Sequence, residues 1–288
     1  MSPERRSTAE LPELAVTGST GAVGGLVARQ LAGAGLAQRL LVRTVGRAPQ
    51  LPGATVLPCS YADAGASLAA LTGVRTLLMV SGSESADRVE QHRTFVEAAR
   101  RAGVEHIVYT SFVAAAADAT FTLGRDHHAT EQAIRASGMG FTFLRDSLYL
   151  DFLPDMVGED GAIRGPAGDG RLAAVARADV ARVAAAVLQQ PDHHRDVSYD
   201  LTGPEALTLA EAAEQIGRAQ GREVTFSDET LSEAYASRAS YGAPDWQVDA
   251  WVSTYTAIAT GELATVSGDV ERVTGRRPVS LAELLAGS

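Results

Sequence analysis

Lysine is absent from this chain of 288 residues, and all 25 of its basic residues other than histidine are arginine. Arginine stays protonated in proteins, so it cannot serve as a Schiff-base amine or as an ammonium group with an adjustable pKa. A Walker-type phosphate loop requires a lysine and is therefore excluded. The same absence excludes every catalytic site that depends on a paired tyrosine and lysine.

Cysteine, long apolar runs and positive charge are also scarce. The single cysteine, Cys59, excludes a disulfide within the chain and argues against a thiolate-rich metal site. No apolar run is long enough to span a membrane, and the N-terminal segment MSPERRSTAELPEL lacks the apolar core of a signal peptide, so we expect a cytoplasmic protein. The formal net charge of −10 argues against nucleic acid and anionic membranes as partners.

Short apolar runs alternate with helical patterns from Leu14 to about residue 150. The runs LAVTG, RLLVR, TVLPC, RTLLMVSG, EHIVYTS and FTFLRDS predict six buried strands. Segments such as ADRVEQHRTFVEAARRAG and the region around ATEQAIRASG predict helices between them. Strands that are apolar throughout are typical of a parallel sheet covered on both faces. We therefore predict an α/β fold with a doubly wound parallel sheet over residues 13–150, preceded by a flexible tail at residues 1–12.

The pattern changes after Asp151. GEDGAIRGPAGDG predicts a loop, ADVARVAAAVLQQ a helix with Asp179 as its N-cap, and VSYDLTG a further strand. LTLAEAAEQIGRAQG predicts a helix that begins with a capping box formed by Thr208 and Glu211. The rest of the chain favours helix. We predict a smaller lobe over residues 151–288 that is partly interleaved with the first domain.

The segment TGSTGAVGG carries the clearest functional motif. Gly18, Gly21 and Gly24 are three residues apart, directly after the first predicted strand and at the start of the first predicted helix. This arrangement suits the pyrophosphate of a dinucleotide, because glycines let the backbone approach and a helix N-terminus offers free N–H groups. The alternative is a tight turn without a ligand. We predict a cofactor loop made of Gly18, Ser19, Thr20, Gly21, Ala22, Val23 and Gly24.

The end of the second predicted strand indicates which dinucleotide binds. A site for NAD places an acidic residue about 20 residues after the glycine loop, where it holds the ribose diol. Here no acidic residue occurs between Glu13 and Asp63, and the strand ends at Arg43, with Arg47 four residues later. Guanidinium groups suit a 2′-phosphate, so we predict that Arg43 and Arg47 select NADPH. The alternative is that both arginines are solvated surface residues.

Several segments together resemble the NmrA-like atypical short-chain dehydrogenase/reductases. The resemblance rests on the arginine after the second strand and on VTGSTGAVGG, RAGVEHIVYTS, HHATEQAIRASG, FTFLRDSLY and IATGELATVSGDVERVTGRRP, and it spans residues 13–284. Within the family, the chain looks most like the triphenylmethane reductase and NADPH:quinone reductase branch. The resemblance implies a Rossmann domain and a smaller C-terminal lobe, with the substrate in the cleft between them.

The resemblance also implies roles for residues that follow the predicted strands. It suggests that the cofactor's ribose and nicotinamide lie beside Ser81, Gly82, Thr110, Ser111 and Phe112, and its adenine beside Ser60 and Tyr61. Ser60 stands where the family often has aspartate. Ser111 matches the catalytic serine of typical short-chain enzymes, although the tyrosine and lysine partners of that serine are absent.

His127 stands where some NmrA-like reductases have a lysine, one helical turn before Glu131. A histidine can carry a proton near neutral pH, so the resemblance makes His127 a candidate catalytic residue, together with Ser111. The alternative is a solvated histidine at the start of a helix. We expect no metal site, because the pair His193–His194 has no third ligand nearby in the sequence.

Aromatic residues after the sixth strand and in the C-terminal lobe are candidates for an apolar substrate cleft. The alternative for each is an ordinary position in the core. The candidate substrate-binding residues are Phe112, Tyr149, Phe152, Tyr241 and Trp246.

We therefore expect an NADPH-dependent reductase that transfers a hydride directly to a conjugated small molecule such as a quinone. Such acceptors need little help with protons, which suits a site without a strong acid–base pair. Two alternatives remain open: an NADP(H)-binding redox sensor without turnover, and a reductase or cyclase of one biosynthetic intermediate. A monomer or a homodimer is expected.

Overall fold

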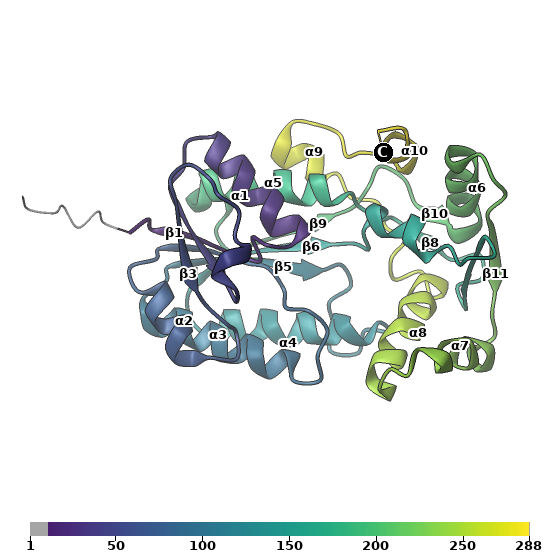
Figure 1. Cartoon of the computed structure of the whole chain (residues 1–288), viewed down its shortest axis with the longest axis horizontal. Helices are drawn as coiled ribbons and strands as arrows, with labels where there is room; N and C mark the ends of the chain where they lie inside the picture. Colours follow the sequence, from purple (N-terminus) through teal and green to yellow (C-terminus); the bar gives the residue numbers. More distant parts are fainter. Residues whose placement is uncertain (1–10, 288) are drawn as a thin grey trace, which may run out of the picture.

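A seven-stranded parallel sheet forms the centre of the computed structural model, which describes residues 11–287 (Figure 1). The strand order is β3-β2-β1-β4-β5-β6-β9. The chain runs outward from β1 to β3 and then crosses back to β4 beside β1, so the order reverses between β1 and β4. The strands are β1 (Leu14–Thr17), β2 (Gln38–Val42), β3 (Ala54–Pro58), β4 (Thr76–Met79), β5 (His106–Phe112), β6 (Gly140–Asp146) and β9 (Val197–Leu201).

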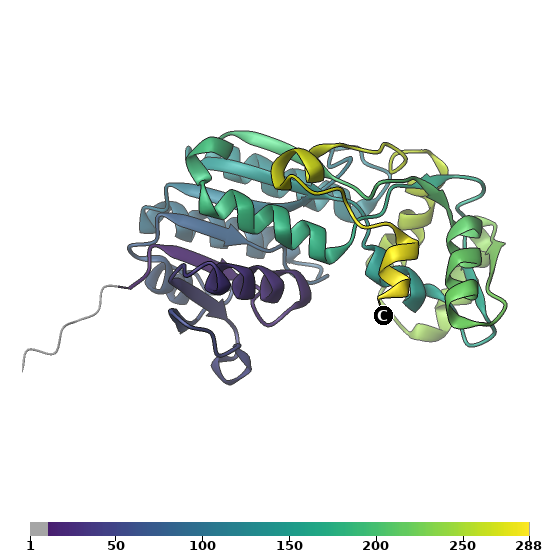
Figure 2. The same cartoon turned by 90° about the horizontal axis from the view of Figure 1, so that it is seen from above.

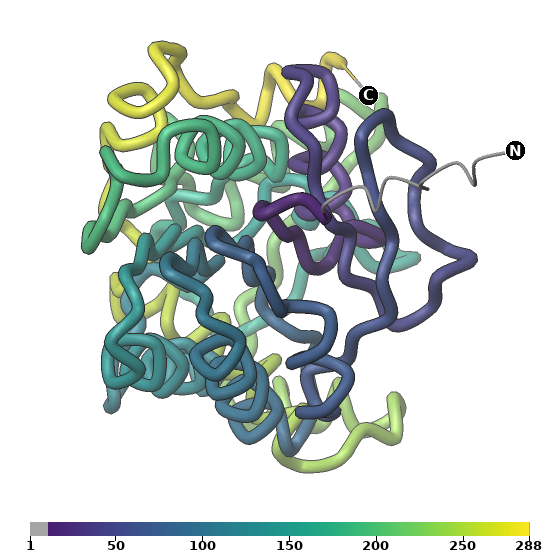
Figure 3. The backbone as a smooth tube through the Cα atoms, turned by 90° about the vertical axis from the view of Figure 1, so that its left-hand side faces the viewer, coloured from purple at the N-terminus to yellow at the C-terminus, as the bar shows by residue number. Residues whose placement is uncertain are grey.

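Helices cover both faces of this sheet, as the end-on view of Figure 3 shows. Every residue of β1, β2 and β5 is buried, which explains why their sequences lack an alternation of apolar and polar residues. One face is covered by α1 (Ala22–Gly33), α5 (Arg177–Gln189) and α9 (Asp269–Thr274), and the other by α2 (Ala64–Leu71), α3 (Arg88–Ala102) and α4 (Thr122–Ala136). The doubly wound α/β architecture predicted from the sequence is confirmed.

A smaller lobe lies beyond the carboxyl ends of the strands (Figure 2). It contains two small sheets, which pair β7 (Ala162–Gly165) with β11 (Thr225–Asp228) and β8 (Arg171–Leu172) with β10 (Leu207–Thr208). Its helices are α6 (Leu209–Gln220), α7 (Leu231–Arg238), α8 (Asp245–Ala259) and α10 (Leu281–Ala286), and α6, α8 and α10 supply a separate apolar core. The short 3-10 turns are η1 (Val45–Arg47), η2 (Leu150–Met156), η3 (Pro191–His194) and η4 (Ala239–Tyr241).

The chain after residue 150 contributes to both parts, because α5, β9 and α9 return to the sheet. The predicted capping box of Thr208 and Glu211 is present at the start of α6. Asp179 is not the N-cap of α5, which is Ala176. It lies in the first turn of that helix, where it accepts a hydrogen bond from the N–H of Val279 at 2.7 Å.

Three further expectations concern the N-terminal tail, the boundary between the two lobes and membrane-spanning helices. Residues 1–10 of the predicted tail lie outside the described residues, and the boundary at residue 150 stays a prediction. None of the helices in residues 11–287 is long and apolar enough to cross a membrane.

Candidate active site

A cavity of about 380 Å³ lies at the carboxyl edge of the sheet, where the strand order reverses. Ligands of parallel sheets bind at such reversals, and small-molecule sites have volumes in this range. The loops after β1, β2, β3 and β4 supply the walls. The lining includes the predicted cofactor residues Gly18, Thr20, Arg43, Ser60, Tyr61, Ser81 and Gly82. The structure thus brings four separate segments of the sequence to one site.

Two of the predicted glycines shape the loop between β1 and α1. Gly18 has a φ of 65°, and a Cβ there would lie 2.9 Å from the Cβ of Val80. A Cβ on Gly24 would collide with the backbone oxygen of Gly18, so Gly24 lets α1 pack closely on the end of β1. Gly21 is the N-cap of α1, and no side chain caps this helix. The first N–H groups of α1 are therefore free of a capping side chain and suit an anion.

The other residues of this loop differ in what they can offer a ligand. Ser19 is buried, and its hydroxyl has no hydrogen-bond partner within residues 11–287. Ala22 is exposed at the start of α1, whereas Val23 packs into the apolar core. Because the side chain of Val23 faces the core, only its backbone is available to a cofactor.

The two predicted phosphate-binding arginines occupy different places. Arg43 directly follows β2 and lines the cavity, whereas Arg47 ends the turn η1 and is not part of the lining. An acidic residue also lines the cavity: Glu84, from the loop after β4. Its Oε2 accepts a hydrogen bond at 2.9 Å from Nε2 of Gln247, so the start of α8 reaches the rim of the cavity.

Tyr61 forms part of the cavity wall and is fixed to the sheet by its hydroxyl. That hydroxyl donates a hydrogen bond to the backbone oxygen of Val80 at 2.6 Å and lies 2.7 Å from Oγ1 of Thr17. The ring stacks on Phe95, with 4.2 Å between the ring centroids. Burial raises the pKa of Tyr61 above its ordinary value, so the phenol stays neutral.

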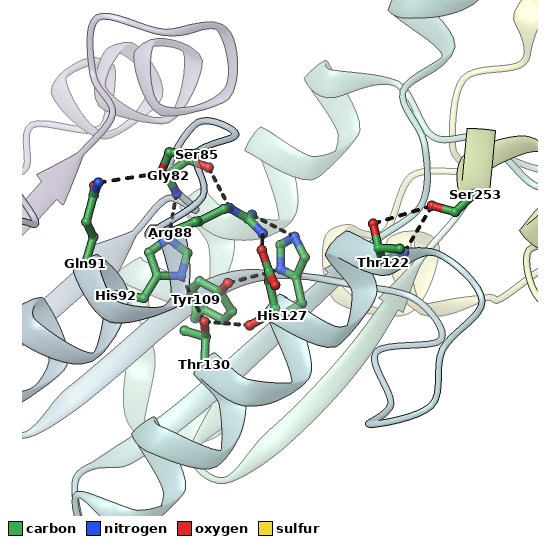
Figure 4. Close-up of polar contacts among 11 residues, drawn as sticks. Gly82, Ser85, Arg88, Gln91, His92, Tyr109, Thr122, His127, Thr130 and Ser253 are labelled. Atoms are coloured by element: carbon green, nitrogen blue, oxygen red, sulfur yellow. Dashed lines mark hydrogen bonds and ion pairs between the residues drawn. The ribbon is translucent and has the colours of Figure 1, made fainter. Parts of the chain in front are cut away.

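Five side chains from α3 and α4 form a polar network beside the cavity, which we call the α3–α4 polar cluster: Arg88, His92, Asp126, His127 and Thr130. All but Asp126, which is half-buried, are buried and are labelled in Figure 4. The cluster holds Gly82 from both sides. The N–H of Gly82 donates to Nε2 of His92 at 2.9 Å, and its backbone oxygen accepts from Nε of Arg88 at 3.0 Å. Gly82 lines the cavity, so the cluster fixes one wall of the site.

The cluster also sets the protonation of its histidines. Because Nε2 of His92 accepts from Gly82, Nδ1 carries the proton, and it donates to Oγ1 of Thr130 at 2.8 Å. Burial, and then the charge of Arg88, lower the pKa of His92 to about 3. Of the five residues in the cluster, sequence reasoning singled out only His127 as a candidate functional residue. The four-residue spacing of Arg88 and His92, matched by that of Asp126 and Thr130, was the available signal.

His127 lies inside this cluster, and the alternative of a solvated histidine is wrong. Helix α4 begins at Thr122, earlier than the sequence pattern indicated, so His127 lies in its second turn and is 7% exposed. Nη2 of Arg88 lies 3.0 Å from Nε2 of His127, and Nδ1 lies 3.0 Å from the hydroxyl of Tyr109. Burial, and then Arg88, hold the pKa of His127 well below its ordinary value. A neutral imidazole is therefore expected near pH 7.

Ser111 is fully buried in β5 on the side that faces α4. Its hydroxyl donates a hydrogen bond at 2.7 Å to Oε1 of Glu131, and Arg145 forms an ion pair with the same carboxylate. The neighbouring Thr110 accepts a hydrogen bond at 2.8 Å from the N–H of Ser81, which lines the cavity. Ser111 therefore has a structural partner, and its catalytic role stays a prediction.

The predicted substrate residues lie in different surroundings. Phe112 packs against Phe121 and His127, with ring centroids 4.9 and 6.0 Å apart. Tyr149 is half-buried, and its hydroxyl bonds to Asp146. Phe152 and Tyr241 are largely exposed, and Tyr241 contacts Trp251 rather than the other candidates. Trp246 is half-buried near the start of α8, next to Gln247.

Comparison with known proteins gives this architecture a family. The model of the NmrA-like family matches residues 12–240. The chain belongs to the NmrA-like family. This NmrA-like chain is 34% identical to quinone oxidoreductase 2 of Escherichia coli, over 94% of the chain and 96% of that protein. It is 32% identical to the NAD(P)H azoreductase of Xenophilus azovorans, over 93% of the chain and 95% of that protein.

A solved structure has the same fold over nearly the whole NmrA-like chain. The triphenylmethane reductase of Citrobacter sp., complexed with NADP(H), superposes with a TM-score of 0.85 at 32% identity and covers 95% of this chain and 99% of its own. The family and branch expected from the sequence motifs are confirmed. In the described part of the chain, no group of three or more histidine, cysteine or acidic residues could hold a metal ion.

Proposed function

We propose that this protein is an NADPH-dependent reductase that passes a hydride to a conjugated, electrophilic small molecule such as a quinone. The observation that carries the proposal is the cavity at the carboxyl edge of the sheet, which is lined by Gly18 and Thr20 of the glycine loop and by Arg43, next to the uncapped start of α1. The names of the relatives, a quinone oxidoreductase and an azoreductase, support the same reaction class. The similarity spans almost the full length of both relatives and of this chain.

The residues present fit NADPH. The start of α1 would bind the pyrophosphate through its free N–H groups, and Arg43 would bind the 2′-phosphate. The buried hydroxyl of Ser19, which lacks a partner in the described chain, suits a polar group of the ligand. Ser81 and Gly82 form the wall toward β5, where Thr110 and the α3–α4 polar cluster fix them. Arg47 does not line the cavity, so it would need to move to contact the 2′-phosphate.

The chain contributes positioning and exclusion of water rather than covalent chemistry. When bound, NADPH supplies the hydride. The rigid wall at Gly82 would orient the bound ring, and Phe112 would cover it with an apolar surface. Contacts of α8 with the rim, through Gln247 and Glu84, would enclose the site.

The alternatives of a sensor without turnover and of a dedicated biosynthetic enzyme gain no support from the names of these relatives. Measurement of NADPH oxidation with a panel of quinones, azo dyes and enones tests the proposal. We expect steady turnover of at least one quinone and slower turnover with NADH. Tight NADPH binding without turnover of any acceptor would instead favour the sensor.

We also propose that the protein acts in the cytoplasm as a monomer or homodimer, without a nucleic acid or membrane partner. The net charge of −10 and the single, buried Cys59 support this setting. Light scattering of the purified protein tests the oligomeric state, and cell fractionation tests the compartment. A higher oligomer or a membrane-bound fraction would contradict it.

A further inference from the structure

Three acidic side chains are buried in the described part of the chain: Glu131, Asp146 and Asp179. Two of them have an arginine partner: Arg145 pairs with Glu131 at 2.7 Å and Arg182 with Asp179 at 2.5 Å. Asp146 forms no ion pair within residues 11–287. Buried carboxyl groups are rarely left without a cation, so the environment of Asp146 differs from that of the other two.

The partner of Asp146 is a phenol. The hydroxyl of Tyr149 donates a hydrogen bond to Oδ2 of Asp146 at 2.6 Å. A carboxyl group held by a neutral donor can keep or release its proton without breaking an ion pair. Asp146 is 5% exposed, so it is largely shielded from bulk water.

The position of Asp146 places it at the edge of the sheet that carries the cavity. It is the last residue of β6 and lies opposite Phe112, the last residue of β5, in the parallel register. β6 is two strands along from β4, whose loop forms a cavity wall. Between them, Thr110 of β5 is bonded to Ser81 of that wall. Phe112 and Asp146 do not line the cavity itself, so a ligand would have to extend from the cavity along this edge to contact them.

The surroundings of Asp146 favour its protonated form. Burial is the largest influence and raises the pKa of Asp146 to about 7. The hydrogen bond from Tyr149 and the positive charge of Arg88 act in the opposite direction and are outweighed. The other titratable or charged groups around this pair are Tyr109, Arg177 and Asp151.

We propose that Asp146 is the proton donor of this reductase and that Tyr149 orients its carboxyl group toward the acceptor. The proposal rests on the reductase function proposed above and assigns the residue that supplies the proton. His127 is less suited, because its Nε2 accepts a hydrogen bond from Arg88 and holds no proton to give. Ser111 is less suited, because its hydroxyl already donates to Glu131.

The step balances in atoms and electrons. The acceptor gains a hydride, with two electrons, from NADPH, which becomes NADP⁺. The O–H bond of Asp146 breaks and a new O–H or N–H bond forms on the acceptor, so the carboxyl group becomes a carboxylate. After the product leaves, the carboxylate takes a proton from water, and no further reactant is needed.

The test compares pH profiles of kcat/KM for a quinone between pH 5 and pH 9. In the native protein we expect the rate to fall as pH rises above about 7, where Asp146 loses its proton. In Asp146→Asn, which keeps the shape of the side chain but cannot donate this proton, we expect a flat profile and a loss of about tenfold or more. An azo dye should show a larger loss, because its reduced nitrogen is more basic.

Two further variants separate this role from a structural one. Asp200→Asn changes an acidic residue on the neighbouring strand β9 and should keep the native profile. Tyr149→Phe removes a hydrogen bond that stabilises the carboxylate, so the midpoint of the profile should move to higher pH. Binding of NADPH, followed by its fluorescence, should be unchanged in Asp146→Asn.

A native-like rate and pH profile in Asp146→Asn would overturn the inference and leave the reductase function standing. A pH profile of kcat/KM that is flat in the native protein would also overturn the inference. This measurement needs no variant, so it remains decisive if Asp146→Asn fails to fold. If none of the acceptors tested supports NADPH oxidation by the native protein, the proposed function itself fails, and the inference fails with it.

Discussion

Nη2 of Arg88 lies 3.0 Å from Nε2 of His127, and arginine can only donate, so Nε2 of this histidine must accept. The proton of the neutral imidazole is then on Nδ1, where it faces the hydroxyl of Tyr109 at 3.0 Å. His127 therefore links two buried polar groups. This relationship changes what a substitution of His127 is expected to do.

His127→Ala should leave the shape of the pH–rate profile between pH 6 and pH 7 unchanged, because the pKa of His127 lies well below this range. The variant removes the imidazole that Nη2 of Arg88 and the hydroxyl of Tyr109 contact, although Arg88 keeps Gly82 and Asp126 as partners, so the free energy of unfolding should fall by about 1–3 kcal/mol. Urea denaturation and a pH–rate series with a quinone measure the two effects. Loss of a titration near pH 6–7 would restore the proton-donor role predicted from the sequence.

The sequence predicted the sheet well because each strand is a local apolar run. It also indicated the glycine-rich turn between β1 and α1, because Gly18, Gly21 and Gly24 lie three residues apart in the chain. The α3–α4 polar cluster was not predictable in the same way. A polar stretch such as residues 122–128 normally faces solvent, but here Asp126 and His127 contact Arg88 of α3. Only the packing of the two helices shows that Arg88 and His127 form a hydrogen bond with each other.

Substitution of the loop glycines should affect stability at Gly24 and NADPH binding at Gly21. Gly24→Ala places a Cβ against the backbone of Gly18 and should lower the free energy of unfolding by about 1–3 kcal/mol. Gly21 has an extended backbone, and its Cβ would lie 3.3 Å from the Gly18 oxygen, so Gly21→Ala should fold normally. Its methyl group would project at the start of α1 and should weaken NADPH binding about tenfold.

Thermal unfolding and NADPH titration, carried out on both glycine variants, measure this contrast. The matched change, one methyl group at each of two positions three residues apart, controls for size. Native-like NADPH affinity in Gly21→Ala would show that the loop is a structural turn rather than a ligand site.

Arg43 and Arg47 provide a matched test of cofactor selection. NADPH should bind about tenfold or more tightly than NADH, and Arg43→Ala should remove most of that difference, because only Arg43 lines the cavity. Arg47→Ala should keep the preference within about twofold. Calorimetric titration with both nucleotides gives the ratio for each variant. Equal effects of the two substitutions would mean that η1 moves toward the ligand on binding.

The stability of the fold should report the protonation of Asp146 independently of any substrate. The pKa of Asp146 is raised from its ordinary value to about 7 in the folded chain, so its contribution to stability is fully present at low pH and declines as pH rises toward 7. Asp146→Asn lacks this dependence. The free energy of unfolding of the native protein should therefore fall, relative to the variant, by roughly 3 kcal/mol between pH 5 and pH 8. Urea denaturation of both proteins at several pH values measures the difference, in which the other carboxyl groups cancel. Parallel curves over this range would mean that Asp146 is ionised throughout, and then it holds no proton for a substrate at neutral pH.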